Sequence, residues 1–277
     1  MKKTGSHKRY ASHVPADSLH RFFVSSEALE GENAILRGRQ AHQISEVLRL
    51  GPGEHIIALD NFGWEHKLRL TKVGKYEIRA EVVGKELATS EPAVRITLFQ
   101  SLGKQDKFEW VLQKCTEIGV VRFVPVIAER SVVRNCREIG ANKLSRWKRI
   151  ITEAAEQSHR GVAPVLDEPI KLEKGMAELE GFERSLIAST RAQGMGLRDS
   201  LRGCGACLTG GVGLALIVGP EGGFTEDEVE RGRAGGAIPF TLGPRILRTE
   251  TAAVVAASVI LYELGELDGR NDSHPGG

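Results

Sequence analysis

The sequence predicts an α/β protein in which a mostly parallel sheet follows a small domain of short strands. From residue 94 onward, apolar runs of strand length alternate with segments of helical periodicity, which is typical of parallel strands joined by helices. Residues 20–88 instead contain short strand-like segments separated by turn signals, a pattern typical of a small barrel. A polar, proline-containing stretch over residues 85–92 separates the two patterns and indicates a domain boundary.

The composition narrows the class of protein. The 277 residues are 41% hydrophobic and 27% charged, which is typical of a soluble globular chain. No apolar run reaches the roughly 18 residues of a membrane span, and no apolar segment follows the basic start. The four cysteines are too few for a disulfide framework, so we expect a cytoplasmic protein. With a net charge of only +2, any nucleic-acid binding must depend on local basic patches.

The first part of the chain is expected to begin with a tail. Residues 1–19 are polar and basic, and we expect a disordered extension whose alternative function is an arm that contacts RNA. One helix is then expected over residues 39–48. The expected strands cover residues 21–24, 33–36, 55–59, 65–70 and 76–83. The basic side chains of this domain fit an RNA-binding platform and a solvated β surface equally well.

The second part alternates strands with helices. The expected strands cover residues 94–101, 123–128, 186–189, 214–218 and 238–242. The expected helices cover residues 104–118, 142–159, 225–233 and 249–264. The last helix is apolar nearly all round, which predicts that it is buried or lies in an interface. A flexible glycine-rich loop is expected over residues 203–213.

The most informative stretch is the loop after the strand at residues 214–218. The run Gly219-Pro220-Glu221-Gly222-Gly223 cannot continue a strand and lets the backbone approach a ligand closely. A Thr225/Glu228 pair then has the spacing of a capping box, so a helix should begin there. A strand, a glycine loop and a capped helix are typical of a ligand-binding loop at the carboxyl edge of an α/β sheet. A tight turn without a ligand is the alternative interpretation.

A second loop of this kind follows the strand at residues 238–242. Gly243 and Pro244 interrupt the strand, and the apolar helix begins near residue 249. The loop carries Arg245, Arg248 and Glu250 at its mouth. Two such loops at adjacent strand ends can build one pocket, although an Arg248–Glu250 ion pair at the helix start is the alternative interpretation.

These two loops resemble the signature loops of a known enzyme family. The segments VGPEGGFT (218–225) and LGPRILRTETA (242–252) are similar to those of the SPOUT RNA methyltransferases, and more narrowly of the RsmE type. Residues 20–24, 108–119 and 146–160 also resemble that family's N-terminal start, first helix and long basic helix. The resemblance covers roughly residues 20–267. It implies methylation of N3 of a uridine in the 16S rRNA of the small ribosomal subunit.

The resemblance also implies a fold, a cofactor and an assembly. The fold would be a parallel-sheet SPOUT domain with a C-terminal trefoil knot, preceded by a PUA-like β-barrel. The implied domains are a disordered extension (1–19), the RNA-binding barrel (20–88), the methyltransferase domain (93–267) and a tail (268–277). The implied assembly is a homodimer. S-adenosylmethionine would be held by three loops, whose implied contacts are Ser189, Thr190, Gly219, Pro220, Glu221, Gly222, Gly223, Leu242, Gly243, Ile246 and Leu247.

The chemistry of uridine N3 suggests which side chains catalyse the transfer. N3 must lose a proton before it becomes a good nucleophile, and negative charge then spreads onto O2 and O4. We expect Arg248 to stabilise that charge because a guanidinium stays protonated and offers several donors. Glu250 and Glu221 are both candidates for the proton acceptor.

A set of basic side chains is expected to contact RNA phosphates. This set contains Arg21, Arg37, Lys104, Lys107, Arg130, Arg134, Arg149, Arg160 and Arg245. No metal site is expected, because the Cys204/Cys207 pair lacks a second pair of ligands at suitable spacing. Two other functions remain open: methylation of another RNA such as tRNA, and RNA binding without catalysis.

Overall fold

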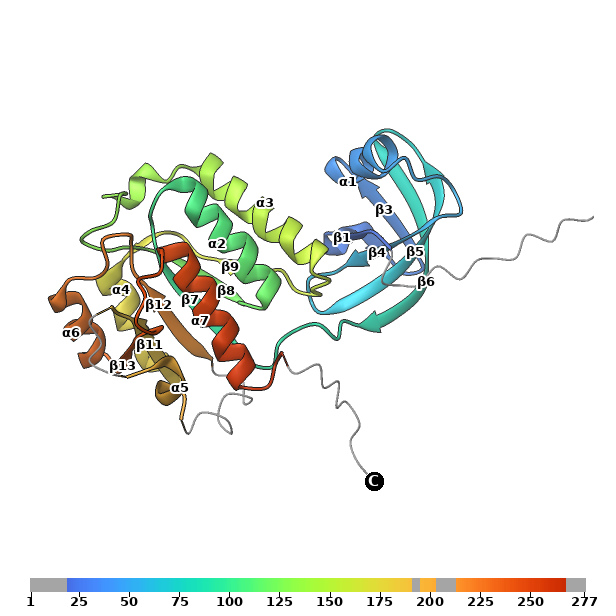
Figure 1. Cartoon of the computed structure of the whole chain (residues 1–277). Helices are drawn as coiled ribbons and strands as arrows, with labels where there is room; N and C mark the ends of the chain where they lie inside the picture. Colours follow the sequence, from blue (N-terminus) through green and yellow to red (C-terminus); the bar gives the residue numbers. More distant parts are fainter. Residues whose placement is uncertain (1–18, 191–194, 203–212, 268–277) are drawn as a thin grey trace, which may run out of the picture. The chain divides into compact units, whose positions relative to one another are not determined.

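The computed structural model describes residues 19–190, 195–202 and 213–267. The chain divides into two compact units, with the division between Leu87 and Ala88 (Figure 1). The expectations for the N-terminal tail, the C-terminal tail, the glycine-rich loop up to residue 212 and the Cys204/Cys207 pair lie outside the described residues. None of the helices in the described ranges is long and apolar enough to cross a membrane.

The N-terminal unit is built on a six-stranded sheet. Its strands are β1 (Arg21–Phe23), β2 (Leu29–Glu30), β3 (Asn33–Arg37), β4 (His55–Leu59), β5 (Trp64–Val73) and β6 (Glu77–Leu87). Their order is β1-β4-β5-β6-β3-β2, and among these described strands only β1 and β4 pair in parallel. Helix α1 (Arg39–His42) continues as a π-helical turn over Gln43–Val47, where one helix was expected.

The sheet of this unit is open, whereas the sequence pattern predicted a barrel. Strands β1 and β2 are the two end strands of the sheet. Since β2 has only two residues, it offers few backbone groups with which an end strand could close the sheet. The core lies on one face, because side chains alternate along a strand: Leu68 and Leu70 of β5 are buried and Arg69 is exposed.

In the described part of the C-terminal unit, seven strands form one sheet in which every pairing is parallel. Its strands are β7 (Ile96–Ser101), β8 (Arg122–Ile127), β9 (Val165–Leu166), β10 (Ile170–Lys171), β11 (Arg184–Ala188), β12 (Leu214–Val218) and β13 (Ala237–Phe240). The order is β10-β8-β7-β12-β11-β13, and β9 also pairs with β8. The helices are α2 (Gln105–Ile118), α3 (Ala141–Gln157), α4 (Leu172–Ala177), α5 (Leu197–Ser200), α6 (Glu226–Ala234) and α7 (Thr249–Glu263).

Both faces of this sheet are buried, which explains why its central strands are continuous apolar runs. In β12, Leu214, Leu216 and Val218 pack with α2, α3 and α7, whereas Ala215 and Ile217 pack toward α4 and α6. Cys115 of α2 belongs to the first of these clusters, and burial raises the pKa of its thiol far above the usual range. Cys115 is therefore a packing residue.

The short elements β9, β10, α4 and α5 were not predicted. They contain between two and six residues each. A segment of this length does not complete enough periods of a strand or helix to be distinguished from a loop. The longer predicted elements are present, with ends that differ from the expected ones by a few residues.

Candidate functional site

Three loops meet at one edge of the parallel sheet. Strands β11, β12 and β13 are neighbours and run in the same direction, so the loops that follow their carboxyl ends lie at the same edge. The loop after β11 begins with Ser189 and Thr190, and the N–H of Ser189 donates to the carbonyl of Phe240 at 2.9 Å. The loops after β12 and β13 contain the two signature segments. The expected cofactor-binding residues are therefore grouped at one place.

The glycine loop after β12 is held tightly by its own neighbours. Gly219 and Pro220 are buried, and a Cβ on Gly219 would lie 3.2 Å from the ring of Phe224. Gly223 has a φ of +66°, a conformation that favours glycine. The capping box predicted from Thr225 and Glu228 is present at the start of α6. The loop is thus fixed at both ends, and Glu221 and Gly222 are exposed between them.

A buried chain of hydrogen bonds connects the glycine loop to β7 and α7. The Gln100 Nε2 donates to the Thr249 Oγ1 at 3.0 Å, and that hydroxyl donates to the Gly219 carbonyl at 2.5 Å. Gln100 is 2% exposed and Thr249 is 9% exposed. Among the described residues, the Gln100 Oε1 and the Ser101 Oγ are buried and have no hydrogen-bond partner. The edge of the sheet therefore carries polar groups that a bound molecule could satisfy.

The two candidate carboxylates lie on either side of one lysine. The Lys107 Nζ is 3.5 Å from the Glu221 Oε1 and 3.4 Å from the Glu250 Oε2. The Glu250 Oε2 is buried and has no partner of hydrogen-bond geometry among the described residues, so its contact with Lys107 is an ion pair only. Burial raises the pKa of Glu221, but backbone donors, including the N–H of Lys104, and the Lys107 ammonium outweigh burial and leave the pKa lowered. Glu221 is therefore ionised at neutral pH and is a weak proton acceptor.

Arg248 is exposed at the start of α7. Its backbone occupies the N-cap position, and within the described part of the chain its side chain has no hydrogen-bond or ion-pair partner. The alternative of an Arg248–Glu250 ion pair is not what the structure shows, because Glu250 pairs with Lys107. Arg245 and Ile246 are also exposed, Ile246 by 86%, whereas Leu242 and Leu247 are half-buried.

The predicted RNA-contacting residues fall into two groups. Those of the first group have exposed side chains; its members are Arg37, Lys104, Arg130, Arg134, Arg149 and Arg245. Arg130 also donates to the Gly222 carbonyl at 3.0 Å, which places a cation beside the glycine loop. Arg37 is tied to Glu77 by two hydrogen bonds of 3.1 and 2.8 Å.

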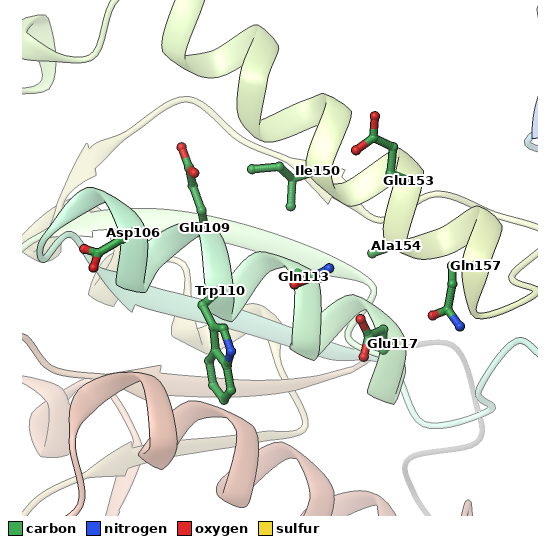
Figure 2. Close-up of a pocket in the computed structure, with 9 residues that line it drawn as sticks. All are labelled: Asp106, Glu109, Trp110, Gln113, Glu117, Ile150, Glu153, Ala154 and Gln157. Atoms are coloured by element: carbon green, nitrogen blue, oxygen red, sulfur yellow. The ribbon is translucent and has the colours of Figure 1, made fainter. Parts of the chain in front are cut away.

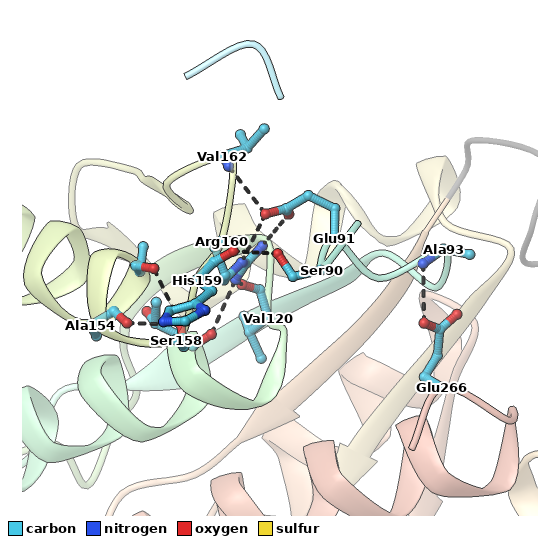
Figure 3. A network of polar contacts seen from close by, with 12 residues as sticks. Ser90, Glu91, Ala93, Val120, Ala154, Ser158, His159, Arg160, Val162 and Glu266 are labelled. Carbon is cyan, nitrogen blue, oxygen red and sulfur yellow. Dashed lines mark hydrogen bonds and ion pairs between the residues drawn. The ribbon is translucent and has the colours of Figure 1, made fainter. Parts of the chain in front are cut away.

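The second group is held inside the protein. Arg21 is paired with Glu65 at 2.5 Å, and both side chains are buried. Arg160 is 3% exposed and donates to Glu91 and to the carbonyls of Thr116 and Val120 (Figure 3). Their expected role as phosphate contacts does not fit this placement, because a buried guanidinium with internal partners presents no donor to a phosphate. Lys107 is half-buried between two carboxylates, Glu221 and Glu250.

Sequence reasoning did not single out Gln100 and Thr249. Gln100 is a polar residue inside the apolar strand run at residues 94–101, and a buried polar side chain in such a run needs a partner. That departure from the apolar pattern was the available signal. Thr249 was included in the second signature segment, but only as the start of a helix.

A groove of about 330 Å³ lies between α2 and α3 (Figure 2). Carboxylates line it, but three of them have cations beside them. Glu109 accepts from Arg146 at 2.7 Å, Glu117 from Lys114 at 2.8 Å, and Glu153 lies 3.9 Å from Arg149. None of the three strand-end loops contributes to its lining. The groove is therefore separate from the candidate site.

Comparison with known proteins assigns the chain to a family. Residues 89–261 match a family model described as an RNA methyltransferase domain. The chain is 33% identical over 254 residues to ribosomal RNA small subunit methyltransferase E of Bacillus subtilis (strain 168), covering 91% of this chain and 99% of that protein. It is 31% identical over 249 residues to the protein of the same name from Aquifex aeolicus (strain VF5), covering 88% and 99%.

The fold is also similar to that of a solved relative. A crystal structure of ribosomal RNA small subunit methyltransferase E from Neisseria gonorrhoeae, bound to S-adenosyl methionine, has a TM-score of 0.76 and 31% identity to this chain. The similarity covers 88% of this chain and 97% of that one. Together with the family model over residues 89–261, these matches show that the chain belongs to the ribosomal RNA small subunit methyltransferase E family of RNA methyltransferases.

Proposed function

We propose that this protein transfers a methyl group from S-adenosylmethionine to N3 of a uridine in the 16S rRNA of the small ribosomal subunit. The observation that supports this most directly is the shared strand edge. Three loops, two carboxylates and an arginine without a partner among the described residues gather at the carboxyl ends of β11, β12 and β13. The relatives that carry the name of an rRNA methyltransferase match nearly the full length of this chain.

The residues at this edge fit S-adenosylmethionine. Gly219 and Gly223 allow close approach to the backbone, and the orphaned Gln100 Oε1 and Ser101 Oγ offer buried polar groups. We propose that the loops of Ser189–Thr190, Gly219–Gly223 and Leu242–Leu247 hold the cofactor, with Leu242, Ile246 and Leu247 against its adenine. When bound, the cofactor would supply an electrophilic methyl group on a sulfonium.

Replacing Thr249 by valine should weaken cofactor binding by about tenfold and also lower the stability of the protein. Valine keeps the shape of threonine but removes the hydroxyl, so the Gly219 carbonyl and the Gln100 amide both lose a buried partner. Such a loss costs about 1–3 kcal/mol, and part of it would appear as disorder in the glycine loop. Calorimetric titration with S-adenosylmethionine measures the effect. Thr249→Ser keeps the hydroxyl and should bind normally; equal binding by Thr249→Val would contradict the role of this chain of bonds.

The side chains at the site can divide the chemistry between them. The uridine N3–H proton passes to a carboxylate, the N3–CH3 bond forms as the S–CH3 bond breaks, and the bonding pair stays on sulfur. Because the pKa of Glu221 is lowered, Glu221 suits a fixed negative charge beside the sulfonium. We assign proton acceptance to Glu250, whose Oε2 is buried without a hydrogen-bond donor. Arg248 then stabilises charge on the uridine oxygens.

The proposal includes several features that the family suggests. The C-terminal unit would contain a trefoil knot, and the open sheet of the N-terminal unit would be a PUA-like RNA-binding module. The domains would be residues 20–88 and 93–267. The protein would be cytoplasmic. A homodimer is supported by α7, on which Val254, Val255 and Val259 are only half-buried and Tyr262 is 59% exposed. The exposed cations Arg37, Lys104, Arg130, Arg134, Arg149 and Arg245 would contact rRNA phosphates.

Methyl transfer from labelled S-adenosylmethionine tests the proposal. Small ribosomal subunits from a strain that lacks this gene and bulk tRNA would be offered in parallel, and the product nucleoside would be identified by mass spectrometry. N3-methyluridine in the subunit is the expected result. Label in tRNA alone would show that another RNA is the substrate. Bound cofactor without label in either RNA would indicate an RNA-binding protein without catalysis.

A further inference from the structure

Lys107 occupies an unusual position for a residue expected to contact RNA. It lies in the first turn of α2, and its side chain is 23% exposed. The ammonium contacts one carboxylate from the loop after β12 and another from the start of α7, at 3.5 and 3.4 Å. It is therefore the charged group that links three separate elements at the edge of the sheet.

The Glu221 carboxylate is fitted closely against the start of α2. A Cβ built on Gly103 would lie 2.7 and 2.8 Å from its two oxygens, so the carboxylate rests on the backbone there. The N–H of Lys104 points at the Glu221 Oε1 from 3.4 Å. The N-terminus of a helix also favours a negative charge. These contacts fix Glu221 in the position where Lys107 can bridge it to Glu250.

Without Lys107, the two carboxylates would share a half-buried site with no cation between them. Their side chains are 31% and 15% exposed, so water screens their repulsion only in part. Like charges in such a site are relieved when one carboxylate takes up a proton or moves away. Either change would remove the ionised acceptor for the N3 proton or displace the charge beside the sulfonium.

We propose that Lys107 is a positioning residue for methyl transfer: its ammonium holds the Glu221 and Glu250 carboxylates together at the site, so that Glu250 is placed to accept the uridine proton. The inference rests on the proposed function, and it replaces the expected role of Lys107 as a phosphate contact. A phosphate would have to compete with two carboxylates that already contact the ammonium. The two carboxylates and the Lys107 ammonium also leave a net negative charge, which complements the positive charge of the sulfonium.

The proposal is tested by steady-state kinetics of Lys107→Met and Lys107→Arg on small ribosomal subunits. Lys107→Met should lower kcat by about 10- to 100-fold. This is less than the roughly 10²–10⁴-fold contribution of a positioned acid or base, because Lys107 acts through the carboxylate that accepts the proton. The KM for the subunit and the Kd for S-adenosylmethionine should each change by less than about threefold. Lys107→Arg should recover most of kcat, because it restores the charge. In the double variant Lys107→Met/Glu221→Gln, the Glu221 substitution should lower kcat by a smaller factor than it does in the parent protein, because both residues belong to one ion pair.

The matched control is Lys114→Met, which removes a lysine paired with Glu117 on the same helix and should leave kinetics unchanged. A raised subunit KM with normal kcat, and a weaker salt dependence of binding, would instead make Lys107 a phosphate contact and overturn the proposal. Unchanged kinetics would overturn it as well. If Lys107→Met melts far below the parent protein, Lys107→Gln replaces it. If the unsubstituted protein did not methylate small ribosomal subunits, the proposed function itself would be rejected. The role of Lys107 is tested separately, because the kcat and KM of each variant are compared with those of an active parent protein.

Discussion

Arg248→Ala is expected to lower kcat by about 100- to 1,000-fold while leaving the Kd for S-adenosylmethionine nearly unchanged. That is the range observed when one donor to a developing negative charge is removed from an active site. Arg248 has no structural partner among the described residues that its loss would disrupt, and it is exposed at the mouth of the site. The effect should therefore appear in the transition state and not in stability. Single-turnover methylation of small ribosomal subunits measures it.

The controls for this prediction separate charge from geometry. Arg248→Lys retains the positive charge but loses the planar set of donors, so we expect an intermediate kcat. Arg233→Ala removes an exposed arginine from α6 that pairs with Glu230, and it should behave like the parent protein. If Arg248→Ala raised the subunit KM and left kcat unchanged, Arg248 would be a substrate-binding residue without a role in the chemical step.

Glu91→Ala is expected to destabilise the C-terminal unit by about 3 kcal/mol, the lower end of the cost of removing one partner from a buried ion pair. Glu91 accepts from Arg160 at 2.8 Å and from the Val162 N–H at 3.1 Å (Figure 3). Arg160 is 3% exposed, so its guanidinium would remain buried without its counter-charge. For a unit of this size, the loss corresponds to a fall in Tm of about 6–12 °C.

Thermal unfolding followed by circular dichroism checks this prediction. Glu91→Gln keeps an oxygen that can accept hydrogen bonds but loses the charge, so its Tm should lie between those of the parent and Glu91→Ala. Glu168→Ala is the matched control, because Glu168 is exposed and should tolerate truncation. A Tm for Glu91→Ala within about 2 °C of the parent would mean that water or other groups compensate the Arg160 charge.

The structural role of Arg160 is supported by the surrounding contacts. Its Nη1 donates to the carbonyls of Thr116 and Val120, at 3.2 and 2.6 Å, where α2 ends. The Ser90 hydroxyl donates to the His159 carbonyl, and His159 has a φ of +61° that directs the chain away from α3. Arg160 thus joins the ends of α2 and α3 to the segment that contains Glu91, which is a packing function in place of an RNA contact.

Local patterns were enough to predict much of this architecture. The strand at Leu214–Val218, the capping box of Thr225 and Glu228, and the interrupted strand before the last helix are all local features, because each depends on residues a few positions apart. Backbone hydrogen bonding, helix capping and strand length act over these short separations. The alternation of such elements predicted a parallel sheet, and with it a common edge for the ligand loops.

Side-chain partnerships required the tertiary structure. Gln100 meets Thr249 although 149 positions separate them in the chain, and Lys107 meets both Glu221 and Glu250. The sequence marks Arg160 and Arg21 only as basic residues, whereas the fold buries both beside carboxylates. An exposed charged side chain can bind RNA, whereas a buried one is paired inside the protein. Which of the two applies depends on how elements far apart in the sequence pack together. The sequence by itself therefore determined which loops form the candidate site, and the packing decided which charges within it remain available.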